Sequence, residues 1–424
     1  MSATATLSAP RATGAAPLLV TVLGLLSAFQ PFALYMYLPG LVPLARDLGA
    51  SAVGAQLTIS AFLLGLALGQ FSAGPLSDRL GRRTPLLACL AVCAAAGAVC
   101  ALTPTLGVLI GARFVQGLAG SAAIVVGRAI VADTMRGRDA ARAFGVLMAV
   151  LGVASVVAPL AGGIVAGTAG WRGVFAALAL LALLMFLAAL VAVPETLPEH
   201  QRAVDLHATT RTVRALLLDG PFLGYALAFT FAFGALMAYV AASPFVFENL
   251  FGLTTATFSL AFALNALGLI LVSTVNSRLV YRFSPRRLLR TGLAVLFVAS
   301  AALWVLAVTG RLSEVTGLPL LLVAVSSLGL VLGNAGSLAL GRDPHAAVTA
   351  SALLGTSQFA FGALVAPLAG LLGDRSAVPL ALAMAVCAVL ALSALALTRD
   401  TLELTLGEPP DAGRTGMRSC DQKG

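Results

Sequence analysis

The chain has 424 residues, of which 59% are hydrophobic and only 10% are charged, with a formal net charge of +9. Soluble globular domains carry about a quarter charged residues, so this composition excludes a water-soluble protein with a single core. The hydrophobic residues recur in blocks of about 20, the length at which a helix spans a bilayer. Lipid offers the backbone no hydrogen-bond partners, so each block must form a helix. We therefore predict an all-α membrane protein.

Twelve membrane-spanning helices are predicted in chain order. They cover residues 18–39, 53–75, 84–103, 106–130, 143–168, 172–193, 220–242, 255–277, 288–309, 318–340, 350–372 and 377–397. The longest polar interval between spans separates the first six from the last six. The expected domains are a tail over 1–17, a six-helix bundle over 18–193, a linker over 194–219, a second bundle over 220–398 and a tail over 399–424.

The positive charges indicate topology rather than a nucleic-acid partner. With the N-terminus inside the cell, most of the 26 Lys and Arg residues, including Arg128, are assigned to cytoplasmic segments. Arg46, Arg172, Arg311 and Arg375 are assigned to the outside. This asymmetry follows the positive-inside rule. We expect a multi-pass protein of a bacterial inner membrane, with both termini in the cytoplasm.

The sequence lacks the residues that several other functional classes require. The only lysine is Lys423 in the tail, so no P-loop lysine is available to bind ATP. His200, His207 and His345 are placed in loops without metal-ligand spacing. Cys89 and Cys93 share a helix face, but small apolar packing is the preferred interpretation because no histidine or acid is near. We expect no metal, no cofactor and no enzymatic activity.

The two halves resemble diverged copies of one another. The sequence Ala-Pro-Leu-Ala-Gly at 158–162 in the fifth span recurs at 366–370 in the eleventh span. The basic loop 79–83 has a degenerate partner at 282–287. Duplicated halves around a central site are typical of secondary transporters.

The most specific segment lies between the second and third spans and reads Gly-Pro-Leu-Ser-Asp-Arg-Leu-Gly-Arg-Arg from residue 74. It resembles the signature loop of the major facilitator superfamily. In that family the loop aspartate lies near the positive N-terminus of helix eleven when the cytoplasmic side is closed. That helix is expected to start here near Ala350. The residues assigned to this conformational latch are Gly74, Asp78, Arg79, Gly81, Arg82 and Arg83.

Arg113 is the one charge assigned to the inside of a span. An arginine within the membrane is costly and marks a pathway or a relay. The segment Arg-Phe-Val-Gln-Gly from residue 113 resembles the helix-four motif of the same superfamily, in which the arginine is tied to proton coupling. We therefore assign Arg113 as a proton-coupling candidate. The alternative is that its side chain reaches toward the outer interface.

The fifth span resembles the antiporter motif of drug exporters in this superfamily, with two of the motif's glycines replaced by alanine. Proline kinks a helix, and paired glycines allow close helix contact, so a purely structural kink is the alternative. The motif favours export over uptake. Its residues here are Gly145, Ala154, Ala158, Pro159, Gly162 and Gly163.

Further segments narrow the resemblance. Met-Tyr-Leu-Pro at 36–39, Pro-Glu-Thr-Leu at 194–197 and Ser-Pro-Phe at 243–245 fall in order along the chain. Together with the loop they resemble the Bcr/CflA-type drug-resistance transporters, which export drugs and antibiotics by proton antiport. The resemblance implies a secondary efflux transporter with a small drug-like substrate and the proton as coupling ion. We expect it to be a monomer. A metabolite transporter of the same fold and a non-transporting membrane sensor remain alternatives.

One departure from that family concerns the end of the first span. The residue before Met36 is commonly an aspartate, and here it is Tyr35. No Asp or Glu falls inside a predicted span, and a buried carboxylate is the simplest partner for a cationic drug and for a proton. We therefore expect neutral or zwitterionic substrates. Proton coupling would then need Arg113 or a loop acid such as Asp47 or Asp78.

The substrate cavity is expected to be lined by polar and aromatic residues on otherwise apolar spans. For each of them, a hydrogen bond between helices is an equally open role. The candidates are Gln30, Tyr35, Tyr37, Gln56, Gln116, Tyr239, Asn265, Asn334 and Gln358.

Overall fold

The computed structural model describes residues 15–199, 202, 206–373 and 375–398, and this part of the chain contains helices and no strand. The predicted tail over 399–424 and most of that over 1–17 lie outside it. The α-helices are α1 (Ala15–Tyr35), α2 (Leu41–Asp47), α3 (Ala52–Leu80), α4 (Arg83–Leu102), α5 (Leu106–Thr134), α6 (Gly137–Ala192), α7 (Leu206–Leu218), α8 (Gly220–Phe245), α9 (Thr255–Leu279), α10 (Pro285–Val308), α11 (Glu314–Leu340), α12 (Ala347–Val365) and α13 (Val378–Ala394).

The predicted number of membrane crossings is confirmed. Eleven segments of the described chain are long and apolar enough to cross a membrane. One of these, α6, has 56 residues and is interrupted at Gly170, whose φ of 68° and ψ of −178° are not helical. The interruption falls between the predicted fifth and sixth spans, so α6 accounts for two of the twelve.

Helix ends follow from local chemistry in both halves. Ser51 begins α3 by accepting a hydrogen bond from the backbone N–H of Gly54 at 3.1 Å. Ser284 caps α10 in the same way, and Asp219 caps α8. These side chains satisfy backbone donors that a helix leaves free at its start. Several spans therefore begin close to where the hydropathy pattern places them.

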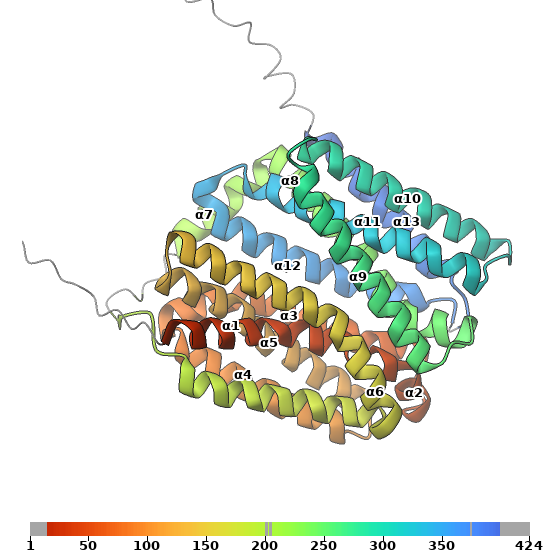
Figure 1. Cartoon of the computed structure of the whole chain (residues 1–424), viewed down its shortest axis with the longest axis horizontal. Helices are drawn as coiled ribbons and strands as arrows, with labels where there is room; N and C mark the ends of the chain where they lie inside the picture. Colours follow the sequence, from red (N-terminus) through yellow and green to blue (C-terminus); the bar gives the residue numbers. More distant parts are fainter. Residues whose placement is uncertain (1–14, 200–201, 203–205, 374, 399–424) are drawn as a thin grey trace, which may run out of the picture.

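The helices form two bundles that lie side by side. Figure 1 shows α1 and α3 to α6 in the lower part of the view and α8 to α13 in the upper part. The long helices run roughly parallel to one another, with α2 at the right-hand end of the molecule. We call this the Asp47 end, after the last residue of α2, and the opposite one the Arg82 end, after the loop between α3 and α4.

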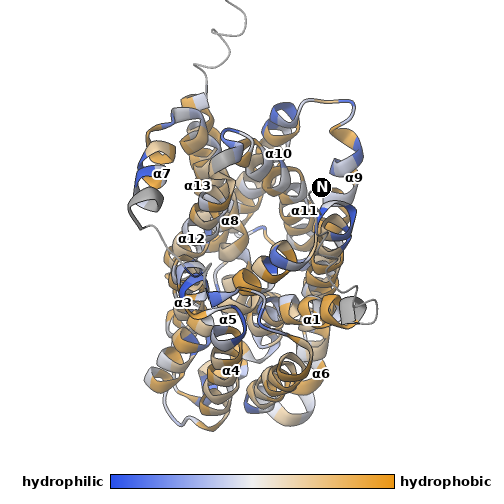
Figure 2. Ribbon diagram, turned by 90° about the vertical axis from the view of Figure 1, so that its left-hand side faces the viewer, coloured by the Kyte–Doolittle hydropathy of each residue, from blue (hydrophilic) through white to orange (hydrophobic). Residues whose placement is uncertain are grey.

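The outer surface of the bundles is apolar. Figure 2 shows that hydrophobic residues predominate along the helices of both bundles. Large side chains such as Phe71, Ile164, Leu260 and Val298 are at least 60% exposed on helices of both halves. Soluble proteins rarely expose contiguous apolar surface of this extent. The surface is that of a protein embedded in lipid.

Candidate functional site

A cavity of about 360 Å³ lies between the two bundles. Helices α1, α3, α5 and α6 form one wall, and α8, α11 and α12 form the other. Of the cavity residues predicted from the sequence, the structure brings Gln30, Tyr35 and Gln358 together here. Their polar groups are set among the rings of Phe229 and Phe233. The combination of an apolar wall and a few polar groups is typical of a small-molecule site.

Two predicted cavity residues are placed between the helices of a single bundle. The hydroxyl of Tyr37 lies 3.3 Å from that of Thr58, which joins the end of α1 to α3. Asn334 of α11 donates to Asn276 of α9 at 2.8 Å. All four side chains are buried. These contacts hold helices together and do not line the cavity.

The remaining predicted cavity residues lie toward the Asp47 end or beside Arg113. Gln56 of α3 donates to the carbonyl of Ala241 in α8 at 3.1 Å, so it links the two bundles. Tyr239 stacks on Phe262 at a centroid distance of 5.3 Å. Asn265 donates to a carbonyl of its own helix, and Gln116 accepts from Arg113.

Arg113 is fully buried within α5, with 0% of its surface exposed. Its guanidinium donates to Oε1 of Gln116 at 2.6 Å and to the carbonyl of Ala33 in α1 at 2.9 Å. It also lies 4.4 Å from the ring centroid of Tyr37 and 4.2 Å from that of Phe62. No acidic side chain pairs with it in the described part of the chain. The side chain does not reach an interface, so the snorkelling alternative does not fit this structure.

At the Arg82 end, the predicted latch residues form a charged cluster within the first bundle. Arg82 pairs with Asp78 and donates to Asp133 of α5 at 2.9 Å. Arg83 donates to the carbonyl of Leu190 in α6 at 2.8 Å. No hydrogen bond or ion pair joins Asp78 to the second bundle among the described residues. Arg79 is exposed, and the space around Gly74 is open.

Glu195 completes this cluster from the segment after α6. Its carboxylate accepts from the backbone N–H of Arg82 at 2.8 Å and of Arg83 at 3.2 Å. Gly81 leaves room for it, since a Cβ there would lie 2.4 Å from Oε2 of Glu195. Burial raises the pKa of this carboxyl, but these N–H groups, that of Leu197 and the charge of Arg202 outweigh burial, so its pKa lies below the ordinary value.

We expect Glu195→Gln to destabilise the protein at pH 7 by about 1–2 kcal/mol, because the amide is uncharged and has one acceptor oxygen, whereas the N–H groups of Arg82 and Arg83 donate to two different oxygens of the carboxylate. A depressed pKa means that the stabilisation is present above the ordinary glutamate pKa and is lost as pH falls through the lower folded value. The difference in melting temperature between wild type and variant should therefore close below about pH 4. Glu199→Gln is the control, because the Glu199 side chain is 91% exposed. A difference that is the same at pH 7 and pH 4 would contradict the assignment.

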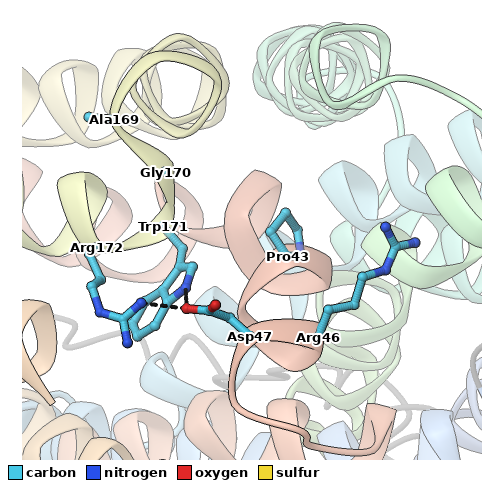
Figure 3. Close-up of a pocket in the computed structure, with 7 residues that line it drawn as sticks. All are labelled: Pro43, Arg46, Asp47, Ala169, Gly170, Trp171 and Arg172. Atoms are coloured by element: carbon cyan, nitrogen blue, oxygen red, sulfur yellow. Dashed lines mark hydrogen bonds and ion pairs between the residues drawn. The ribbon is translucent and has the colours of Figure 1, made fainter. Parts of the chain in front are cut away.

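At the Asp47 end, α2 joins the break in α6 (Figure 3). The carboxylate of Asp47 accepts from Nε1 of Trp171 at 3.1 Å and pairs with Arg172. Arg46 points away from Asp47 and donates to Asn249 of the second bundle at 3.2 Å. These residues border a surface hollow of about 570 Å³. The two neighbouring residues of α2 therefore contact different bundles: Asp47 contacts the first bundle and Arg46 contacts the second.

The predicted antiporter motif lies where α6 meets α1 and α9. A Cβ on Gly162 would lie 1.9 Å from the carbonyl oxygen of Met36, and one on Gly163 would lie 2.3 Å from Oγ of Ser259. Gly162 thus allows contact within the first bundle, and Gly163 allows contact between the bundles. Ala154, Ala158 and Pro159 are buried, whereas a Cβ on Gly145 would meet nothing within 4 Å.

Four functional candidates were missed by the sequence analysis. Gln70, Arg128 and Ser155 line the cavity. The positive-inside rule groups Arg128 with the cytoplasmic charges, although it lies within α5 and within the predicted span 106–130. Glu248 lies in the helical turn Val246–Leu250, which continues α8 beyond the predicted span, and its Oε1 is buried without a hydrogen-bond partner. The sequence signal that could have identified Glu248 is that it follows the apolar end of α8 with no Gly, Pro or Asn turn residue in between, which indicates that the helix continues through it.

The fold and the cavity between two bundles define a polytopic membrane transporter. The family profile described as Major Facilitator Superfamily matches residues 23–341. The chain belongs to this superfamily.

Its relatives include proteins named for drug resistance. It is 36% identical to the "Uncharacterized MFS-type transporter YdgK" of Bacillus subtilis, over 88% of this chain and 93% of that one. It is 30% identical to the "Bicyclomycin resistance protein homolog" of Haemophilus influenzae, over 88% and 94%. It is 32% identical to a "Chloramphenicol resistance protein" of Pseudomonas aeruginosa, over 73% and 74%. These names are consistent with the Bcr/CflA-type resemblance.

Solved structures confirm the predicted fold. A bacterial homologue of the human lysosomal transporter Spinster, in an inward-facing and unoccupied conformation, matches with a TM-score of 0.73 at 16% identity, over 94% of this chain and 100% of that one. A D-xylose–proton symporter matches with a TM-score of 0.68 at 15% identity, over 91% and 97%. At these identities the likeness concerns the fold alone.

Proposed function

We propose that this protein is a secondary active efflux transporter that exports small amphipathic drugs or antibiotics by alternating access and proton antiport. The observation that carries the proposal is the amphipathic cavity between two bundles of a superfamily transporter. The resistance names of its relatives support drugs as the substrate class. We place it as a monomer in a bacterial inner membrane, with the Arg82 end and both termini in the cytoplasm, because most of its arginines lie at that end.

The contacts between the two bundles support the interpretation that the Asp47 end, which we take as the outer side, is closed in this structure. Arg46 to Asn249, Gln56 to Ala241 and the approach of Gly163 to Ser259 all lie toward the Asp47 end. Toward the Arg82 end the cavity reaches Arg128, and Asp78 is paired within its own bundle. The proposed latch would then act when the Arg82 end closes, as Asp78 approaches the start of α12.

Proton coupling has two candidate groups in this proposal. Among the described residues, Arg113 is a fully buried cation without a countercharge. Glu248 is the acid with a buried, unpartnered oxygen, and it faces Arg46 and the hydroxyl of Thr255. An acid placed at the contact between bundles could link protonation to the opening of that end.

The direct test is resistance in a pump-deficient bacterial strain. Expression should raise the minimum inhibitory concentration of at least one compound in a drug panel, and a protonophore should restore drug accumulation. A panel without any resistant compound, in cells that hold the protein in the membrane, would contradict export.

Alternating access is tested by a cross-link at the Asp47 end. Gly163→Cys with Ser259→Cys, in a variant without the five native cysteines, places two Cβ atoms about 2.9 Å apart, close enough for a disulfide after a small relaxation. Oxidation should abolish transport, and a reducing agent should restore it. Gly167→Cys with Ser259→Cys is the control, because nothing lies within 4 Å of a Cβ at 167. Full transport by the cross-linked protein would rule out opening of this end.

A further inference from the structure

The cavity between the two bundles is positively charged, although its described lining is otherwise uncharged. Among the described residues that line it, Arg128 is the only charged side chain, and no acid faces it. Arg128 lies six residues before the end of α5, about 9 Å along the helix, so it is inside the spanning segment and not in the following loop. The cavity therefore carries a net positive charge.

No residue in the described ranges neutralises the charge of Arg128. Arg128 is exposed and makes no hydrogen bond or ion pair in the described part of the chain. The acid nearest to it along α5, Asp133, is already bound to Arg82 at 2.9 Å and to the hydroxyl of Thr196 at 3.2 Å. By contrast, the other arginine of this helix, Arg113, is buried and held by Gln116 and Ala33. The two arginines of α5 thus have different environments.

The surroundings of Arg128 fit a ligand with two chemically different parts. Gln70 and Ser155 line the same cavity and offer uncharged hydrogen-bonding groups. Phe229 and Phe233 of α8 supply an aromatic wall. A guanidinium binds carboxylate, sulfonate or phosphate groups through two parallel N–H bonds, and this attraction is stronger in a site of low dielectric than in water.

We propose that Arg128 is an anion-binding residue of the substrate cavity, so that the protein prefers amphipathic compounds carrying an acidic group, as anions or zwitterions. This inference rests on the proposed function and refines its substrate class. The same charge disfavours lipophilic cations, because no acid compensates for it among the described residues that line the cavity. An arginine that only reaches toward lipid headgroups would give the cavity no such preference.

The experiment measures binding, which does not require transport. Full-length protein in nanodiscs is dialysed against matched pairs of aromatic compounds that differ in one group: chloramphenicol and its hemisuccinate, and aryl carboxylates and aryl sulfonates with their neutral esters or amides. Wild type should bind the acid of at least one pair more tightly than its neutral partner. Arg128→Gln should weaken binding of that acid roughly 10- to 100-fold, the value of one charge-assisted contact, and change the neutral compound less than about threefold.

Two further variants separate this role from a structural one. Arg128→Lys keeps the charge and should retain part of the preference for the acid. Arg290→Gln removes an exposed charge from α10, outside the cavity, and should leave the preference unchanged. The proposal is overturned if wild type shows no preference for any acid, or if Arg128→Gln leaves the preference intact or weakens both members of a pair equally. Failure of the efflux proposal is distinguishable, because it appears as absent resistance in cells while the binding preference can still be measured.

Discussion

Replacing Arg113 with methionine is expected to reduce transport at least 100-fold while the protein remains folded. The guanidinium joins α5 to the carbonyl of Ala33, two residues before Tyr35, which lines the cavity. Hydrogen bonds from a charged donor are each worth about 1.5–3 kcal/mol. If both bonds act in the transport cycle, losing them should lower the transport rate by more than about 100-fold. The variant also removes the cost of burying a charge without a countercharge, so the melting temperature should change little. Transport in proteoliposomes and thermal unfolding in detergent measure the two effects.

Arg113→Lys tests whether charge alone is sufficient. A single ammonium cannot replace the guanidinium fork that donates to Gln116 and Ala33 from different nitrogens, so we expect most of the loss to remain. Arg311→Gln is the matched control, because Arg311 is exposed and makes no side-chain bond in the described chain. If Arg113→Met transports at the wild-type rate, the assignment of Arg113 to the transport cycle is wrong.

Gly162→Ala is expected to be the most destabilising single-methyl change in α6. The added Cβ would lie 1.9 Å from the carbonyl oxygen of Met36, and because this neighbour is backbone, α1 and α6 must move apart. Overpacking of this kind costs about 1–3 kcal/mol or more. We expect a clear drop in melting temperature and in the amount of protein in the membrane, measured by thermal unfolding and by fluorescence-detected chromatography.

Gly145→Ala provides the comparison within the same helix and the same motif. Nothing lies within 4 Å of a Cβ at this position, and alanine favours a helix by about 1 kcal/mol over glycine. This variant should be as stable as wild type or slightly more stable. Equal destabilisation by the two substitutions would show that the close contact with Met36 does not account for the effect.

The polar candidates show what the sequence could and could not predict about the site. Gln30, Tyr35 and Gln358 line the cavity, but Tyr37 and Asn334 bind neighbouring helices instead. Both groups look alike in sequence, because each is a polar residue on an apolar span. Which one faces the cavity depends on the rotation of each helix, and that rotation is set by packing against other helices.

Arg128 was misplaced for a related reason. Counting charges by the positive-inside rule assigns an arginine near the end of a span to the adjoining segment. Arg128 is two residues before the end of the predicted span 106–130, and the cavity reaches this turn of α5 because α1, α3 and α6 leave space beside it. Glu248 escaped notice because the helical turn Val246–Leu250 carries α8 past the end of the apolar run.

The sequence by itself determined the number of crossings, the bounds of most spans, the break near Gly170 and the superfamily. These properties depend on the length of apolar runs, on local capping and on short motifs, all of which act between residues close in the chain. Only the tertiary structure decided that Gln56 reaches Ala241, that Arg113 is buried with no acid paired to it in the described chain, and that Arg128 faces a cavity. These three features depend on residues that are far apart in the sequence. They follow from the close packing of the helices in the two bundles and not from the hydropathy of any single helix.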